Sequence, residues 1–253
     1  MGLADALRCN VLTIDIETRP HLAHVWALWD QNVGLSQLME VGTVICWAAK
    51  WGHEKRVMYR SDFHDGHEAM VAEAWKLMDA ADVVIGYNHK AFDVKHLHRE
   101  FVLAGMPPPA PHRDIDLLTV ARSRFKFASN KLDHVASELG LGSKVKHSGH
   151  DLWVRCMNDD PTAWATMKRY NIGDVKLTEA VYAHLRPWIK NPPHPGLFGG
   201  AIDGCPNCGG TDLVRNGTHK AASRQYRQYR CGGCGASSRG DVVAGTSTAT
   251  RSV

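Results

Sequence analysis

The segment Asn10-Val-Leu-Thr-Ile-Asp-Ile-Glu17 guides the interpretation of the rest of the chain. It has the alternation of a β-strand, in which successive side chains point to opposite faces of a sheet. Asp15 and Glu17 would share one face, and the other face would pack the core with Leu12, Ile14 and Ile16. Two neighbouring acids repel one another, and hard cations such as Mg²⁺ or Mn²⁺ relieve that repulsion. The alternative is an acidic strand end that binds nothing.

Around this strand the sequence predicts an α/β fold, a mixed sheet flanked by helices. Further strands are expected at 41–51, 55–59, 82–86 and 113–118. Helices are expected at 64–80, 91–104 and over most of the chain from 119 to about 186. In the first of these helices, apolar residues recur every three or four positions.

A second candidate segment is Gly86-Tyr-Asn-His-Lys-Ala-Phe-Asp93, which leads from a buried strand into a helix. Asp93 would lie in the first helical turn, with Asn88 just before it. The alternative is purely structural, because an acid interacts well with the helix dipole and asparagine is a good cap.

The third candidate is Tyr170-Asn-Ile-Gly-Asp174, whose tyrosine and aspartate are four residues apart and share a helix face. That face continues as an apolar stripe at Met167, Leu177 and Val181. A carboxylate within such a stripe costs free energy unless it is paired or binds a metal. The alternative is an aspartate at the edge of the stripe. Gly173 costs the helix about 1 kcal/mol relative to alanine, which indicates close approach by another group.

Four of the seven cysteines form two C-x-x-C pairs, Cys205 with Cys208 and Cys231 with Cys234. Two such pairs predict a structural Zn²⁺ site in a small ribbon module, with disulfides as the alternative. The other three cysteines are expected to be buried apolar residues: Cys9, Cys46 and Cys156.

Composition divides the chain into four parts. Residues 1–188 are expected to form the main domain, 189–204 a Pro- and Gly-rich linker, 205–239 the ribbon and 240–253 a disordered tail. From residue 205 onward there are seven Lys or Arg and two Asp or Glu, whereas the first 204 residues hold 23 and 24. This positive end suits a polyanion, although four zinc-bound thiolates would reduce its net charge.

Two stretches mix basic and aromatic residues, a composition typical of single-strand binding. Around Phe125 and Phe127 lie Arg122, Arg124, Lys126 and Lys131, and an ordinary basic surface over core phenylalanines is the favoured interpretation there. In the ribbon, Arg224, Arg227 and Arg230 alternate with Tyr226 and Tyr229. The alternative for the two tyrosines is that they form the ribbon's own small core. We favour nucleic acid as the partner of this second stretch over a protein.

The three acidic segments occur in order as Asp15-x-Glu17, Asn88-x-x-x-Phe92-Asp93 and Tyr170-x-x-x-Asp174. This pattern resembles the ribonuclease H-like 3′–5′ exonucleases with four acidic residues, in the variant with tyrosine in the last motif. It is similar to family B polymerase proofreading domains and to stand-alone phage and bacterial exonucleases. Residues 131–144 are similar to the segment before the last motif in those proteins, and the resemblance covers about residues 10–188.

The resemblance implies two Mg²⁺ or Mn²⁺ ions. Asp15 would bridge both ions, Glu17 and Asp174 would complete the ion that carries the attacking water, and Asp93 would hold the second ion largely through water. Tyr170 would orient the water. The residues expected to contact the terminal nucleotide are Thr18, Asn88 and Phe92.

The predicted function is metal-dependent hydrolysis of phosphodiester bonds at the 3′ end of DNA, expected to be single-stranded, in DNA replication or repair. Two alternatives stay open: an exoribonuclease with the same site, and a non-catalytic nucleic-acid-binding scaffold. A replication protein that contacts the ribbon is a further expected partner. No apolar run reaches membrane-spanning length and no secretory signal is recognisable, so the expected location is the cytoplasm of a bacterium, or of the host if the protein is phage-encoded.

Overall fold

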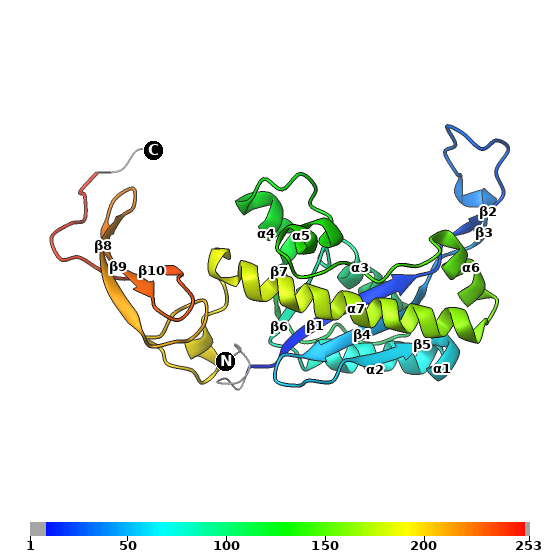
Figure 1. Cartoon of the computed structure of the whole chain (residues 1–253), viewed down its shortest axis with the longest axis horizontal. Coiled ribbons are helices and arrows are strands. Elements are labelled where there is room, and N and C mark those ends of the chain that lie inside the picture. The colour runs from blue at the N-terminus through cyan, green and yellow to red at the C-terminus, as the bar shows by residue number, and fades with distance from the viewer. Residues whose placement is uncertain (1–8, 251–253) are drawn as a thin grey trace.

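The computed structural model describes residues 9–250, and its larger part is a five-stranded sheet with helices on both faces (Figure 1). The strand order is β5-β4-β1-β6-β7. The central strand β1 pairs antiparallel with β4 and parallel with β6, which confirms the predicted mixed α/β sheet. The strands are β1 (Val11–Thr18), β4 (Val44–Trp51), β5 (Met58–Ser61), β6 (Val83–Gly86) and β7 (Arg113–Asp116).

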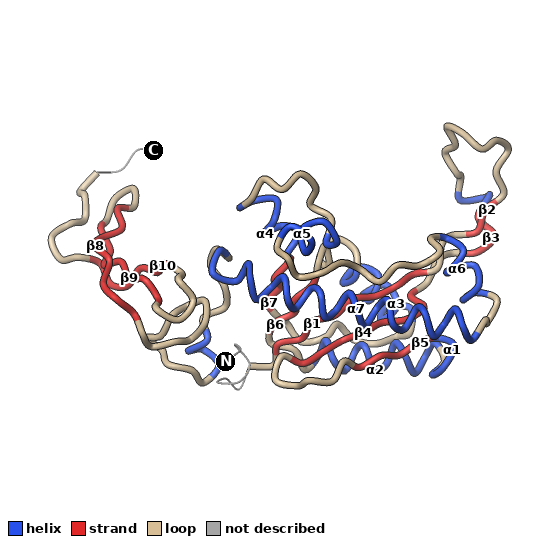
Figure 2. Tube along the Cα trace, viewed as in Figure 1, coloured by secondary structure: helices blue, strands red, loops and turns tan. Residues whose placement is uncertain are grey.

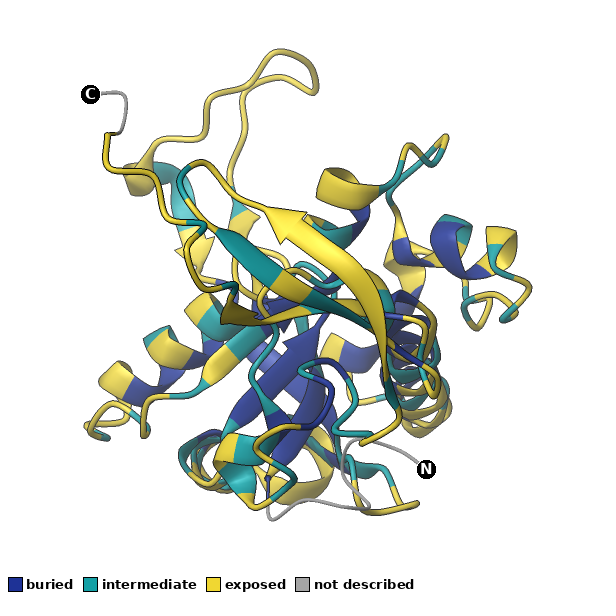
Figure 3. Ribbon diagram, turned by 90° about the vertical axis from the view of Figure 1, so that its left-hand side faces the viewer, coloured by how far each residue is buried: buried dark blue, intermediate teal, exposed yellow. Residues whose placement is uncertain are grey.

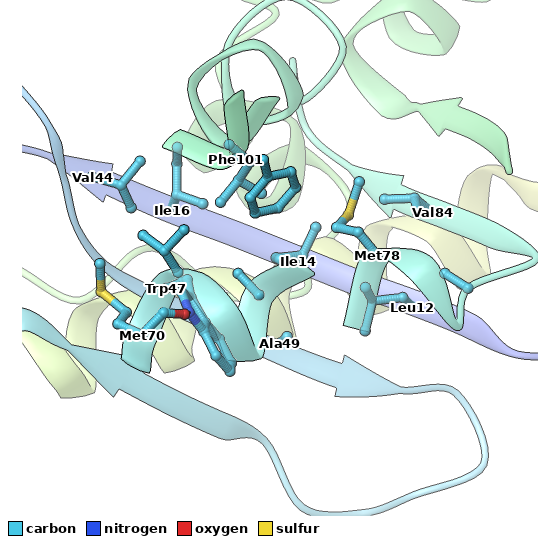
Figure 4. Close-up of a cluster of buried hydrophobic side chains, with 14 residues drawn as sticks. Leu12, Ile14, Ile16, Val44, Trp47, Ala49, Met70, Met78, Val84 and Phe101 are labelled. Atoms are coloured by element: carbon cyan, nitrogen blue, oxygen red, sulfur yellow. The ribbon is translucent and has the colours of Figure 1, made fainter. Parts of the chain in front are cut away.

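One face of the sheet is covered by α2 (His67–Asp79) and α3 (Asp93–Leu103). Figure 4 shows the core at this face, where Leu12, Ile14 and Ile16 of β1 meet the helices. The Trp47 indole N–H donates to the Met70 carbonyl at 2.9 Å, so this large buried side chain also has its polar group satisfied. The even-numbered residues of β1 therefore pack as the alternation predicts.

The opposite face is crossed by the long helix α7 (Pro161–Leu185), with α4 (Leu117–Arg124), α5 (Leu132–Glu138) and α6 (His150–Met157) beside it (Figure 2). The Asp160 carboxylate starts α7 by accepting from the N–H groups of Thr162 at 2.8 Å and Ala163 at 3.3 Å. Pro161 fits the first helical position because it has no N–H to leave unpaired. The buried side of α7 carries the third candidate motif onto the sheet.

Several element boundaries differ from those expected: the strands expected at 41–51 and 55–59 are β4 and β5, and loops at 125–131 and 139–149 interrupt the span expected to be mostly helical. Two further differences have a clear local cause. The helix expected at 64–80 is interrupted at Gly66, whose φ of 80° separates α1 (Asp62–Asp65) from α2. The strand expected at 113–118 ends at Asp116, because that carboxylate accepts from Leu118 N–H at 3.0 Å and starts α4. The regular pattern thus ends through a backbone conformation at Gly66 and through a capping carboxylate at Asp116.

Residues 19–43 leave the end of β1 as a projecting arm (Figure 1). Its elements are β2 (Leu22–Ala23), η1 (Leu35–Gln37) and β3 (Leu38–Glu40). Its tip exposes large apolar side chains, with Trp26 at 95% and Trp29 at 82%. Short, irregular pairing of this kind leaves no periodic pattern in the sequence.

The ribbon is a three-stranded antiparallel sheet of β8 (Leu213–Lys220), β9 (Gln225–Cys231) and β10 (Ser237–Val242). It extends past the expected boundary at 239. Beyond β10 the backbone returns to the sheet, since Val243 N–H donates to Gln225 O at 2.8 Å and Thr248 N–H to Ser223 O at 2.9 Å. The part of the expected disordered tail between 240 and 250 is therefore hydrogen-bonded, and residues 251–253 lie outside the described range.

The expected linker at 189–204 contains the short helix η3 (Pro195–Phe198), which follows η2 (Arg186–Trp188). Figure 3 shows the buried residues concentrated in the larger sheet, whereas the ribbon strands are mostly exposed. None of the helices between residues 9 and 250 is both long enough and apolar enough to cross a membrane.

Candidate active site

Three carboxylates from two elements converge on the α7 face of the sheet. Asp15 and Glu17 lie on β1 and Asp174 lies on α7, and one oxygen from each falls within 4.8 Å of the other two. The structure thus brings together three of the four acids that the sequence selects. β1 supplies two of them because alternate residues share a face, and α7 supplies the third by packing across β1.

Asn171 joins the two elements that carry these acids. Its side-chain amide donates to the Asp15 backbone oxygen at 3.1 Å and to Asp15 Oδ2 at 2.7 Å. Sequence reasoning missed this residue, although it lies inside the third motif on the buried side of the helix. The pairing of β1 with β4 shifts register between Glu17 and Thr18, at the end of the strand that carries two of the acids. Such bulges commonly adjust side chains beside active sites.

Asp93 approaches β1 from α3. Its Oδ1 accepts from the Ile16 N–H at 2.9 Å, and its side chain is buried. The ladder between β1 and β6 ends at Thr13 and Ile85, so Ile16 N–H needs another acceptor. Asp93 is the first residue of α3, as predicted, but it stands apart from the group formed by the other three acids.

Lys144 is a residue of the site that the sequence analysis did not select. Its ammonium donates to Asp174 Oδ2 at 2.5 Å and to the Tyr170 hydroxyl at 3.0 Å. The loop that carries it is fixed by Asp133, whose carboxylate accepts from the Lys144 backbone N–H at 2.6 Å. The stretch 131–144, singled out by its resemblance, therefore delivers a cation to the acidic cluster.

Gly173 lets this loop approach α7. A Cβ at position 173 would lie 3.1 Å from Val145 Cγ2, which is tighter than ordinary van der Waals contact. The close approach that the glycine indicated is therefore present, and the approaching group is the neighbour of Lys144.

The acids carry raised pKa values because they are buried close together. Burial and then the nearby Asp174 raise the pKa of Glu17 to about 8. Burial raises the pKa of Asp93 to about 6, in spite of its hydrogen bond from Ile16. For Asp15, burial followed by repulsion from Asp93 and Glu17 raises the pKa well above its ordinary range. Such a cluster favours either protons or cations.

The donor set fits a divalent cation. Asp174 Oδ1 is buried and has no hydrogen-bond partner in the described part of the chain. A buried acceptor of this kind is costly unless a ligand satisfies it. Carboxylate oxygens are the ligands that Mg²⁺ and Mn²⁺ prefer, so the three converging acids are suited to hold such an ion.

A cavity of about 550 Å³ opens beside Asp15 and Lys144. Asn88, one of the predicted substrate-binding residues, lines it, whereas Thr18 and Phe92 are not among its lining residues and their roles stay predictions. Arg122 and Lys131 also line it, so part of the basic stretch faces the site. Phe125 and Phe127 pack against the core, as the surface interpretation predicted.

The loop that holds Asn88 is organised by Asp116. Its carboxylate accepts from the backbone N–H of Asn88 at 3.0 Å and of Lys90 at 3.3 Å, in addition to starting α4. Asn88 adopts a φ of 67°, which asparagine tolerates better than most residues. No motif marks Asp116 in the sequence, because its partners are backbone groups from a distant loop.

The ribbon contains a second candidate metal site. The sulfurs of Cys205 and Cys234 lie 3.7 Å apart and those of Cys208 and Cys231 lie 3.6 Å apart. Zn–S bonds of about 2.3 Å in a tetrahedron place sulfurs about 3.8 Å apart, whereas a disulfide needs about 2.05 Å. The four-cysteine cluster is therefore consistent with a zinc ribbon, and the three other cysteines are buried as expected.

Comparisons with known proteins agree with this geometry. The family model of the RNase H superfamily called RNase_H_2 matches residues 33–186, a range that begins after Asp15 and Glu17. A search of curated protein sequences gives no match.

Among solved structures, the chain is similar to the family B DNA polymerase from the hyperthermophilic archaeon Pyrobaculum calidifontis. The TM-score is 0.55 at 20% identity, over 71% of this chain and 25% of the polymerase. The likeness is one of fold, and this chain spans about a quarter of the polymerase. Because the family model covers more than half of its length, the chain belongs to the RNase H superfamily.

Proposed function

We propose that this protein is a metal-dependent 3′–5′ exonuclease that shortens single-stranded DNA in replication or repair. The observation that carries the proposal is the convergence of Asp15, Glu17 and Asp174 beside a cavity, with an unpaired buried oxygen on Asp174. The order of the acidic motifs supports the 3′ polarity. The similarity to a DNA polymerase supports DNA as the substrate.

The acids would hold the divalent ions. Asp15, Glu17 and Asp174 offer three oxygens to one position, and Asp93 offers its second oxygen from the α3 side. When bound, two such ions activate a water and stabilise the leaving oxygen of a phosphodiester. Asn171 keeps Asp15 in place through both of its hydrogen bonds.

Tyr170 would orient the attacking water. Burial raises the pKa of its hydroxyl above the ordinary range, so the group keeps its proton and acts as a donor. Lys144 donates to the hydroxyl oxygen, which leaves the hydroxyl proton free to point at the water. The water would lose one proton to solvent as its oxygen bonds to phosphorus, the bond from phosphorus to the 3′ oxygen of the preceding nucleotide would break, and that oxygen would take one proton from solvent. The products are a nucleoside 5′-monophosphate and a shortened strand with a 3′-hydroxyl.

The first test is digestion of a 5′-labelled single-stranded DNA with Mg²⁺ or Mn²⁺, beside an RNA of the same sequence. We expect a ladder that shortens from the 3′ end, and loss of at least about 10³-fold in rate for Asp174→Ala. Melting curves of the variant check that it folds. Faster shortening of the RNA would assign an exoribonuclease. Absence of metal-dependent cleavage of both strands by the folded protein would favour the non-catalytic scaffold.

The four cysteines of the ribbon would bind one structural Zn²⁺. The small cluster that surrounds them contains few other apolar side chains, so the ribbon depends on the metal for its fold. Its partner would be nucleic acid or a replication protein.

A further inference from the structure

A second and larger cavity lies between the ribbon and the main domain. Its volume is about 1050 Å³, and we call it the ribbon cleft. One wall comes from the end of α4 and the segment after α7, and the other from β8, β9 and the start of β10. The residues that characterise it are Arg124, Trp188, Lys190, His219, Arg230 and Arg239.

Specific contacts fix the two walls of the ribbon cleft relative to one another. Asn207, in the first cysteine pair of the ribbon, donates from its side-chain amide to the carbonyl of Arg186 at 2.8 Å and of Ile189 at 3.4 Å. Asn207 is only 4% exposed. Phe198 of the connecting segment packs against the core of the main domain. The two walls therefore form a built surface.

The lining of the cleft has one sign of charge. Four of its side chains are Arg or Lys, and within residues 9–250 no Asp or Glu lines it. Trp188 contributes an aromatic ring that is 59% exposed, and its inner edge is fixed against Phe125 at 5.4 Å between ring centroids. Cations together with an exposed, anchored ring are the features that bind phosphates and stack bases.

The last turn of α4 contributes to both the ribbon cleft and the active-site cavity. Arg122 lines the active-site cavity and Arg124, two residues later at the end of α4, lines the ribbon cleft. Residues two apart on a helix point to nearly opposite sides. The last turn of α4 thus stands between the two cavities and presents a cation to each.

We propose that the ribbon cleft binds the upstream part of the single strand whose 3′ end lies in the active site. This rests on the proposed exonuclease function. The strand would pass from the acidic cluster over the last turn of α4, stack on Trp188 and contact Arg230 and Arg239 of the ribbon. The ribbon then sets how strongly long strands are held, while the acids perform the hydrolysis.

Binding is tested in zinc-loaded Asp174→Ala protein, which holds a strand without cleaving it. The probe is a fluorescent single-stranded DNA of about 20 nucleotides, titrated at several salt concentrations. Combining Arg230→Glu with Arg239→Glu should weaken binding about tenfold or more. It should also make the salt slope less steep by about 0.7 for each lost phosphate contact. Arg124→Glu alters the opposite wall and should act in the same direction.

Arg215→Glu is the matched control, because Arg215 is exposed on β8 of the same ribbon and does not line the cleft. It should bind the probe as the parent protein does. Equal weakening by Arg215→Glu and by the cleft variants would overturn the proposal, because general surface charge would then explain the binding. Unchanged binding by all of these variants would also overturn it and would leave an acidic protein as the fitting partner.

Hydrolysis assays distinguish a failure of the ribbon-cleft proposal from a failure of the proposed exonuclease function. In active protein, the ratio of kcat/KM for the long strand to kcat/KM for a strand of about three nucleotides is the quantity to measure. In the cleft variants this ratio should fall toward one, mainly because KM for the long strand rises. An active wild-type enzyme whose preference for long strands is unaffected by the variants would sink the cleft alone. A wild-type protein that binds the probe through the cleft and cleaves neither strand would sink the exonuclease function alone.

Discussion

Lys144 contributes to the site through two contacts, one to an acid and one to the tyrosine. Burial lowers the pKa of Lys144, but the neighbouring Asp174 and Tyr170 together raise it more. The pKa therefore lies above its ordinary range, and the side chain is charged at any working pH. We expect Lys144→Met to reduce kcat by roughly 10²-fold with little change in KM, since the Lys144 ammonium positions Tyr170 and Asp174. Steady-state kinetics with Lys146→Met as control checks this, because Lys146 is exposed two residues away. Equal loss in both variants would contradict a specific role.

Gly173 offers a way to separate stability from activity. Alanine gains up to about 1 kcal/mol of helix propensity over glycine, and its Cβ would lie 3.1 Å from Cγ2 of the loop residue Val145, which must then move. We expect Gly173→Ala to raise the melting temperature and to lower kcat, because the displaced loop carries Lys144. Thermal melts and kinetics on the same preparation measure both effects. A variant with unchanged or higher kcat would show that the loop position is not critical.

At this scale, the sequence indicates which acids lie together where chemistry and periodicity act together, and the roles of these acids stay predictions. The sequence places Asp15, Glu17 and Asp174 among apolar residues that pack the core. A carboxylate in such a position costs free energy unless it is paired or binds a metal, so the sequence alone marks these acids. Lys144 follows Gly140 and Gly142 in an irregular loop, and lysine is usually exposed. Its role depends on where that loop crosses α7, which no local pattern encodes.

Between elements, a buried acid joins α3 to the start of β4. Glu100 on α3 is 3% exposed, and its carboxylate accepts from the Val44 N–H at the start of β4 at 3.3 Å. His67 at the start of α2 lies 3.2 Å from Glu100 and 3.0 Å from Asp62. The hydrogen bond to Asp62 is the largest contribution that raises the pKa of His67, and burial opposes it.

This histidine predicts a pH dependence of folding. Because the folded pKa of His67 exceeds its unfolded value of about 6.5, its stabilisation is complete below that value and is lost as pH rises through the folded pKa. We expect His67→Gln to be less stable than wild type near pH 6, with the difference shrinking toward pH 8. Urea unfolding at both pH values measures it, with the exposed His184→Gln as control. A difference that grows with pH would contradict the assignment.

The elements themselves could be predicted where periodicity is long, and their ends could not. The strand β1 follows from alternation, and the buried face of α7 follows from its long apolar stripe. The split between α1 and α2 depends on the backbone conformation of Gly66, and the end of β7 depends on Asp116 acting as a cap. The arm at 19–43 and the return of the chain after β10 are set by a few backbone hydrogen bonds.

In the whole molecule, the main domain and the ribbon have apolar cores of very different size. The main domain has three contiguous apolar clusters, whereas the ribbon has one small cluster centred on Cys205, Cys231 and Ala236. A module with so little apolar burial depends on a metal or on neighbours for its fold. Asn207 is the side chain that links the ribbon to the end of α7.

This difference predicts the effect of removing zinc. A zinc-selective chelator should unfold the ribbon and leave the main domain with its own cooperative melt, because the cores of the two bodies are separate. Limited trypsin digestion should then cut first at the basic residues of β9, Arg227 and Arg230, while the main domain persists. Long-strand binding should fall as it does in the cleft variants, and added Zn²⁺ should restore it. Loss of the main melting transition on chelation would show instead that the two bodies fold as one unit.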